Sequence, residues 1–311
     1  MSLEALALLL AASVNSGTAL LLAALGLLLS ERSGVLNLGA EGLMLVGAIA
    51  GFATAVHTHG EWLALLAGAG AGAALACLFG LLVIFLNTNQ YASGLALSLF
   101  GSGFSAFAGL RYTQESLGES AKHGLGALAR LPLLGPALFS YHPVVYLAMA
   151  LTGALAWFLF RSRSGLVLRA VGEAPESAHA LGYSVQKIRF ACVVAGGALC
   201  GLAGAYISVV YAHLWVEGIT AGKGWIALAL TTFATWRPLR VLCGAYLFGA
   251  LTMLELHLQG EGVDVPPQLL AMLPYLATIL VLALISRGRA LRRLGLPASL
   301  GKPFHPGART T

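Results

Sequence analysis

Charged residues are scarce in this chain. Lys, Arg, Asp and Glu together make up 10% of its 311 residues, and 58% of the residues are hydrophobic. A typical soluble domain has about 25% charged residues. One water-soluble core cannot cover this much apolar surface. The composition therefore excludes an ordinary soluble globular protein and predicts an integral membrane protein.

Cysteine is also rare. Cys77, Cys192, Cys200 and Cys243 all lie in apolar runs and form no C-x-x-C pair. This spacing indicates neither a disulfide framework nor a zinc site. We expect buried thiols that only contribute to packing, and no metal centre.

Motifs of nucleotide binding and catalysis are missing. The sequence has no G-x-x-x-x-G-K-[ST] loop, no H-E-x-x-H and no G-x-S-x-G, and Asp264 is its only aspartate. Most histidines are separated from one another by whole hydrophobic runs. We therefore expect a protein that is not an enzyme and has no cofactor.

Long hydrophobic runs are abundant instead. A run of about 20 residues crosses a hydrocarbon core of roughly 30 Å. Four uncharged runs reach this length, namely 62–86, 91–110, 190–212 and 265–286. Residues 3–29 are apolar except for Glu4 and read as a retained span rather than a signal peptide, and residues 143–160 form a shorter uncharged run.

Basic residues orient these runs. Of the 18 Lys and Arg, all except Arg111, Lys122, Arg130 and Lys223 lie at position 32 or in the ranges 161–189, 237–240 and 287–309. The positive-inside rule places those segments in the cytoplasm. Alternation then requires about nine spans, with the N-terminus outside and the C-terminus inside.

The short apolar stretch 224–236 decides this count. If it were re-entrant, the basic residues after position 286 would move to the outer face. We predict instead a crossing that begins near Val216 and is broken by Gly218, Gly222 and Gly224, whose opened backbone must be satisfied by neighbouring helices. The predicted fold is an all-α, polytopic helix bundle in one membrane domain over residues 1–311. Residues 161–189 and 287–311 form its cytoplasmic loop and tail.

The formal net charge of +6 follows from these loops. Basic residues are scattered around the ends of the runs, without aromatic interleaving on a polar domain, so nucleic-acid binding is not indicated. Their side chains suit snorkelling to the headgroups of membrane lipid.

A polar junction at residues 30–42 separates the first two hydrophobic runs. An ionisable group inside a bilayer costs roughly 2.5–3.5 kcal/mol on insertion scales, so Glu41 indicates a protein-lined or water-filled path. Asn37 and Glu41 lie one helical turn apart and can face one passage. Alternatively, Glu41 caps a neighbouring half-helix or pairs with Arg32.

A second polar group lies at the start of the run 91–110. Asn87, Asn89, Gln90 and Ser93 offer hydrogen-bond donors and acceptors suited to sugar hydroxyls or a base edge. Together with the two residues above, they are the candidates for the permeation path.

The loop 161–189 contains the signals of a short helix outside the membrane. Pro175 suits a first helical turn, Gly182 suits a C-terminal cap, and Glu173 and Glu176 lie at the positive end of the helix dipole. Ala178 belongs to a small apolar surface, and so short a helix needs something to dock on. The alternative is an ordinary interfacial linker.

Several motifs resemble a known family. Ser33-Gly34-Val35-Leu36-Asn37-Leu38-Gly39-Ala40-Glu41-Gly42 resembles the opening signature of ABC importer permeases of the ribose, branched-chain amino acid and nucleoside class. Segments 89–97, 172–178, 222–229 and 300–304 follow in the order expected of that class. The pattern Asn89-Gln90-x-x-Ser93-Gly94 and the ending 300–304 resemble the nucleoside branch more than the ribose branch. Tyr91 and Lys223 depart from the expected smaller aliphatic residue and Arg.

The resemblance implies a nucleoside permease that crosses the bacterial cytoplasmic membrane several times. Its implied partners are an extracytoplasmic solute-binding lipoprotein, a second related permease and a cytoplasmic ABC ATPase. It also makes the short helix an ATPase-coupling element, with Glu173, Pro175, Glu176, Ala178 and Gly182 as its residues.

Alternative functions remain open at this point. A permease for ribose or another simple sugar would share most of these motifs. An ion-coupled secondary transporter would also use broken helices, and Glu41, Glu217 or Glu255 would carry its proton. An intramembrane enzyme is less favoured, because no nucleophile and base can be paired.

Overall fold

The computed structural model describes residues 3–118, 140–260 and 296–305, together with the single positions 266, 269, 272 and 276. Its α-helices are α1 (Leu3–Arg32), α2 (Ala40–Thr58), α3 (Glu61–Gly80), α4 (Gln90–Gly109), α5 (Pro143–Arg161), α6 (Arg163–Glu173), α7 (Pro175–Ala180), α8 (Val185–Ala205), α9 (Lys223–Phe233) and α10 (Pro238–Gly260). Two π-helical segments, η1 (Leu81–Phe85) and η4 (Tyr206–Tyr211), continue α3 and α8.

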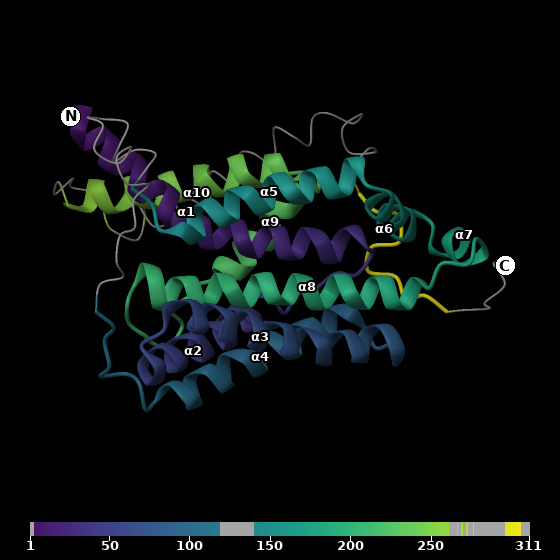
Figure 1. Cartoon of the computed structure of the whole chain (residues 1–311), viewed down its shortest axis with the longest axis horizontal. Coiled ribbons are helices and arrows are strands. Elements are labelled where there is room, and N and C mark those ends of the chain that lie inside the picture. The colour runs from purple at the N-terminus through teal and green to yellow at the C-terminus, as the bar shows by residue number, and fades with distance from the viewer. Residues whose placement is uncertain are drawn as a thin grey trace.

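The long helices lie roughly side by side in a bundle (Figure 1). Seven helices in the described ranges are long and apolar enough to cross a membrane, which confirms the all-α polytopic fold. The predicted span 265–286 lies outside the described residues. The count of nine spans and the placement of the two termini stay predictions.

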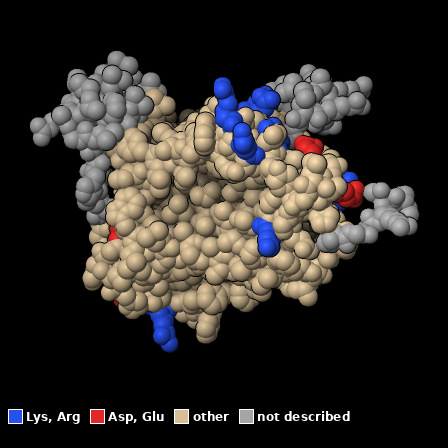
Figure 2. All heavy atoms as spheres, turned by 45° about the vertical axis from the view of Figure 1, so that its right-hand side comes forward, with Lys and Arg blue, Asp and Glu red and all other residues tan. Residues whose placement is uncertain are grey.

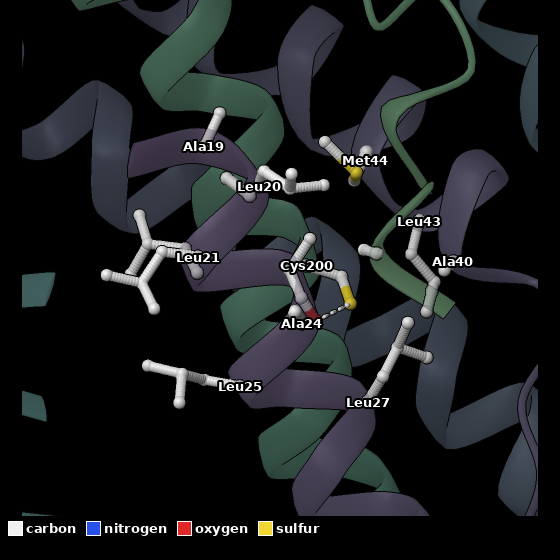
Figure 3. Close-up of a cluster of buried hydrophobic side chains, with 14 of the residues drawn as sticks. Ala19, Leu20, Leu21, Ala24, Leu25, Leu27, Ala40, Leu43, Met44 and Cys200 are labelled. Carbon is white, nitrogen blue, oxygen red and sulfur yellow. Dashed lines mark hydrogen bonds between the residues drawn. The ribbon is translucent and has the colours of Figure 1, made fainter. Parts of the chain in front are cut away.

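Side chains of α1, α2 and α8 form the centre of the core. Leu20 and Leu27 of α1 lie near Leu43 and Met44 of α2, and the Cys200 thiol of α8 donates to the Ala23 carbonyl at 3.6 Å (Figure 3). Cys192 is buried like Cys200, Cys77 is partly buried and Cys243 is exposed, so the expectation of buried thiols is wrong for Cys243.

Glycines allow α3 and α8 to cross closely. A Cβ at Gly72 would lie 2.7 Å from the Cα of Gly201, and a Cβ at Gly201 would lie 2.8 Å from the Cα of Gly72. Such contacts suit a membrane, where packing rather than hydrophobic transfer holds helices together. Gly70, in contrast, has open space around it.

The predicted break before α9 is present, whereas the crossing of this segment stays a prediction. The chain from residue 212 to 222 is irregular and includes left-handed backbone at Gly218 and Gly222, and helix begins only at Lys223 rather than near Val216. The 11 residues of α9 span about 16 Å at 1.5 Å per residue. This is half of a hydrocarbon core of roughly 30 Å.

The two ends of the bundle differ. At one end, residue Leu117 donates its amide to the His213 carbonyl at 2.8 Å, which joins the segments after α4 and after η4. The other end carries α6 and α7 (Figure 1). Lys and Arg side chains visible in Figure 2 gather mostly near that end, beside a broad uncharged surface.

The glycine crossing gives a stability prediction. Replacing Gly72 or Gly201 with Ala should lower the free energy of unfolding by about 1–3 kcal/mol, because the added methyl overpacks a backbone contact. Gly70→Ala is the matched control and should leave stability unchanged or slightly raised. Thermal unfolding of the purified protein in detergent measures this, and equal melting temperatures for all three variants would contradict the crossing.

The charge distribution gives a topology prediction. The loop residue Ser120 lies outside the described residues, but Ser116 is exposed at one end of the bundle and Ser177 is exposed at the α7 end. A cysteine introduced at Ser116 should react with a membrane-impermeant thiol reagent in intact cells, and one at Ser177 should not. Both cysteines are introduced into a Cys243→Ser variant, because the exposed Cys243 would itself react with the reagent. Equal labelling at both positions would refute the proposed orientation.

Candidate translocation site and coupling segment

Glu41 lies at the N-terminal end of α9. Its Oε1 accepts hydrogen bonds from the Thr220 hydroxyl at 2.5 Å and the Gly222 amide at 2.9 Å, and its Oε2 accepts from the Gly224 amide at 2.6 Å. The first amides of a helix have no partner within it and carry partial positive charge. A carboxylate therefore both satisfies these donors and interacts favourably with the helix dipole. The structure shows the half-helix cap that the sequence left as an alternative.

Glu31 and Arg32 hold the other end of the same half-helix. Glu31 is buried, and its Oε2 accepts from the Trp236 indole at 2.5 Å and the Thr231 hydroxyl at 3.1 Å. The Arg32 guanidinium donates twice to the Trp236 carbonyl, at 3.1 and 3.2 Å. Arg32 thus contacts the end of α9 rather than Glu41, so the alternative of a Glu41–Arg32 pair is not observed.

The turn held by these residues has an uncommon backbone. Thr235 and Trp236 have φ values of 50° and 52°, in the left-handed region that L-residues seldom adopt. Such conformations persist where the surroundings fix them. The bonds from Glu31 and Arg32 to Trp236 supply that fixation, so α1 determines where α9 ends and α10 begins.

Most other permeation candidates form hydrogen bonds within the chain. Asn37 is buried, and its Oδ1 accepts from the Gly39 amide at 2.9 Å. Asn89 caps α4 by accepting from the amides of residues 91 and 92. The buried Gln90 accepts from the Leu36 amide at 2.9 Å, and the Ser93 hydroxyl bonds to Thr88. The structure therefore joins the 30–42 junction to the start of α4.

Asn87 differs from these residues. Its Oδ1 is buried and has no hydrogen-bond partner among the described residues, and its backbone is left-handed with φ of 52°. A buried acceptor without a partner is costly and favours a visiting donor. Asn87 is thus the permeation candidate whose side-chain oxygen has no hydrogen-bond partner among the described residues.

A cavity adjoins the start of α9. It has a volume of about 270 Å³, and Lys223, Ser16, Thr252 and Glu255 contribute polar groups to its lining. Glu255 accepts a hydrogen bond from Gln259 in the same helix at 3.2 Å. Because Glu41 and Lys223 lie at the same helix terminus, a change at α9 would alter this cavity.

The short helix predicted in the loop 161–189 is present as α7, Pro175–Ala180. Pro175 occupies its first turn, Gly182 is left-handed with φ of 89°, and the Tyr183 amide donates to the Ala178 carbonyl at 3.1 Å. Glu173 ends α6, and Glu176 lies in the first turn of α7. These features confirm the helix and its end, whereas its coupling role stays a proposal.

Ala178 has a different environment from the one expected. It is 2% exposed and packs with Val171, Val185 and Phe304 of the same chain. This placement corrects the expectation that Ala178 itself contacts a partner. Leu181, directly after α7, is 78% exposed, and Tyr183 beside it is 43% exposed, so this end presents apolar side chains.

Sequence reasoning missed the partners of these groups. Thr231 and Trp236 lie in an apolar stretch and carry no motif that would pair them with Glu31. A signal existed in the pair Glu31-Arg32 itself, because two adjacent charges at the end of an apolar run need partners from other helices. The sequence alone does not tell which helices supply them.

Comparisons with known proteins agree with this architecture. The family described as branched-chain amino acid transport system / permease component matches residues 9–283. A putative glucose ABC transporter permease of Haloferax volcanii is 43% identical over 96% of this chain and 97% of its own length. A guanosine ABC transporter permease of Bacillus subtilis is 33% identical, covering 91% and 93%, and a nucleoside ABC transporter permease of Lactococcus lactis is 33% identical, covering 86% and 88%. No solved structure matches the chain.

The family match extends over most of the chain, and the relatives are similar over nearly their whole lengths. This result confirms the resemblance found in the motifs. It also favours an ABC permease over the alternative of an ion-coupled secondary transporter. The chain belongs to the branched-chain amino acid transport system / permease component family and is a permease subunit of an ABC transporter.

Proposed function

We propose that this permease carries nucleosides into the cell across the bacterial cytoplasmic membrane. The observation that carries the substrate choice is the pattern Asn89-Gln90-x-x-Ser93-Gly94 at the start of α4, which resembles the nucleoside branch. Two relatives named for guanosine and nucleoside transport, each 33% identical, support it.

A simple-sugar substrate is the second candidate. The relative that is 43% identical is named a putative glucose permease, and amide groups such as that of Asn87 suit sugar hydroxyls as well as a base edge. Both solute classes are neutral and rich in hydrogen-bonding groups. The permease need bind either of them only weakly, since transport requires release.

The proposed assembly has four kinds of component. An extracytoplasmic solute-binding lipoprotein delivers the solute, this chain pairs with a second related permease, and a cytoplasmic ABC ATPase drives the cycle. We place the passage beside the 30–42 junction and the start of α4, with Asn37, Glu41, Asn87 and Gln90 around it. The ATPase docks near α7, where Leu181 is exposed.

The half-helix α9 fits a moving part of such a passage. Its two ends are held by Glu41 and by Glu31 with Arg32, all from the α1–α2 region. A displacement of that region must therefore move α9 or break charge-assisted hydrogen bonds, which are the stronger ones in proteins. Repacking of α9 would then open or close the cavity at its start.

Glu41 tests this account. Glu41→Ala removes the acceptor of three donors and should lower the free energy of unfolding by about 1–3 kcal/mol, as expected for buried groups left unpaired. Uptake should fall with it, and Glu41→Gln should have an intermediate effect on both quantities, because one amide oxygen remains. Glu115→Gln is the control, since this carboxylate is exposed and makes no contact with α9 or the cavity. Thermal unfolding and uptake by reconstituted vesicles measure the two effects. Loss of uptake in Glu41→Gln with wild-type stability would contradict a capping role and favour direct contact of this carboxylate with the solute.

The solute is tested through the partner. The external binding protein co-purified with this permease should release a nucleoside on denaturation, identified by mass spectrometry. Recovery of a hexose or pentose without a nucleoside would overturn the substrate choice and establish the sugar alternative. The mass of the detergent-extracted complex should at the same time include two permease chains, because closed pairs are the usual symmetry of such assemblies.

A further inference from the structure

A segment near the C-terminus is fastened to the α7 end of the bundle. Residues 296–305, which we call the C-terminal strap, run past the end of α6, where the amide and hydroxyl of Ser299 both donate to the Gly172 carbonyl at 3.1 and 2.6 Å. The Gly301 amide donates to the Gly34 carbonyl of the α1–α2 loop at 3.3 Å. The strap thus contacts two elements that are far apart in sequence.

Phe304 joins the strap to α7. It is 7% exposed and packs with Val171, Ala178 and Val185, and its ring lies edge-on to that of His179, with centroids 5.6 Å apart. A helix of six residues is not stable alone. Burial of Ala178 beneath Phe304 therefore holds α7 in place.

Arg189 of α8 fixes the strap at its middle. The guanidinium is buried and donates to the Ser33 carbonyl at 3.1 Å, the Lys302 carbonyl at 3.3 Å and the Ser299 hydroxyl at 2.9 Å. One rigid, forked side chain thus bonds both the α1–α2 loop and the strap. Lysine has a single ammonium group and cannot reach three such acceptors in the same way.

Gly34 shows how closely these parts meet. A Cβ at this position would lie 2.5 Å from the Ser299 hydroxyl and 2.8 Å from an Arg189 nitrogen, and its φ of 95° also favours glycine. Contact with the strap and Arg189 therefore explains why position 34 of the 30–42 junction is a glycine. This contact connects the two motifs, 33–42 and 300–304, that lie at opposite ends of the sequence.

These contacts form one path from α7 to Glu41. Ala178 packs on Phe304, the strap bonds to Arg189 and Gly34, and the α1–α2 loop leads on to the residues that hold α9. Close-packed interiors pass on displacements rather than absorb them. We propose that the C-terminal strap links the coupling helix to the α1–α2 loop, and that Arg189 is the residue that positions it. This inference rests on the proposed ATPase docking near α7.

The test uses the complete importer in lipid vesicles, with uptake and ATP hydrolysis measured together. Phe304→Ala should reduce solute uptake by about five- to tenfold, while the ATPase stays bound and its activity without solute stays within about twofold of wild type. Arg189→Lys should give the same pattern. Phe304→Leu should restore most uptake, because it retains an apolar contact. Lys302→Ala is the matched control, since its side chain is exposed and only its backbone carbonyl is bonded.

Wild-type uptake in both Phe304→Ala and Arg189→Lys would overturn the proposal. A parallel loss of uptake and ATP hydrolysis, with a lowered melting temperature, would show that the strap only stabilises the fold. If Arg189→Lys does not fold, the uptake of the Phe304→Ala variant alone decides whether the proposal holds. All comparisons use the solute that the binding protein delivers, so an error in the nucleoside assignment would leave this test intact. Loss of the ATPase from the wild-type complex would instead refute the proposed assembly, on which this inference rests.

Discussion

A carboxylate placed at the start of a half-helix is the interaction on which the rest of this structure depends. An irregular backbone inside a membrane protein needs internal partners for its amides, because lipid offers none. Glu41 supplies them to Gly222 and Gly224 and also accepts from Thr220. Without this group the chain between η4 and α9 would leave donors unpaired, and Ala221 and Lys223, which line the cavity, would lose the fixed backbone beside them.

The same stretch of sequence serves both ends of α9. Glu31 and Arg32 bond to Trp236 at the C-terminal end of α9, and Glu41 bonds to the first amides of α9. Residues 31–41 therefore fix both ends of the half-helix. The same segment accepts hydrogen bonds from Arg189 at the Ser33 carbonyl and from the C-terminal strap at the Gly34 carbonyl. The proposed coupling helix therefore reaches the proposed passage through contacts within one chain, without a long moving loop.

Sequence patterns predicted the fold class, the short helix α7, its glycine cap and the break before α9. These features depend on composition or on neighbouring residues, so one local stretch contains their cause. The contacts of Glu31 with Trp236, of Arg189 with Ser299 and of Ala178 with Phe304 join residues separated by more than a hundred positions. Ala178 was expected at an outer surface because alanine in a short helix carries no mark of what covers it. The sequence also does not distinguish Gly72, which meets the backbone of α8, from Gly70, which has open space around it.

Hydrogen–deuterium exchange of the segment 220–226 tests the central claim most directly. The account predicts that these amides exchange slowly in the wild-type protein, because Glu41 bonds those of Gly222 and Gly224, and that Glu41→Ala speeds their exchange while the amides in the middle of α8 stay protected. Fast exchange of 220–226 in the wild-type protein, or unchanged exchange in Glu41→Ala, would contradict it.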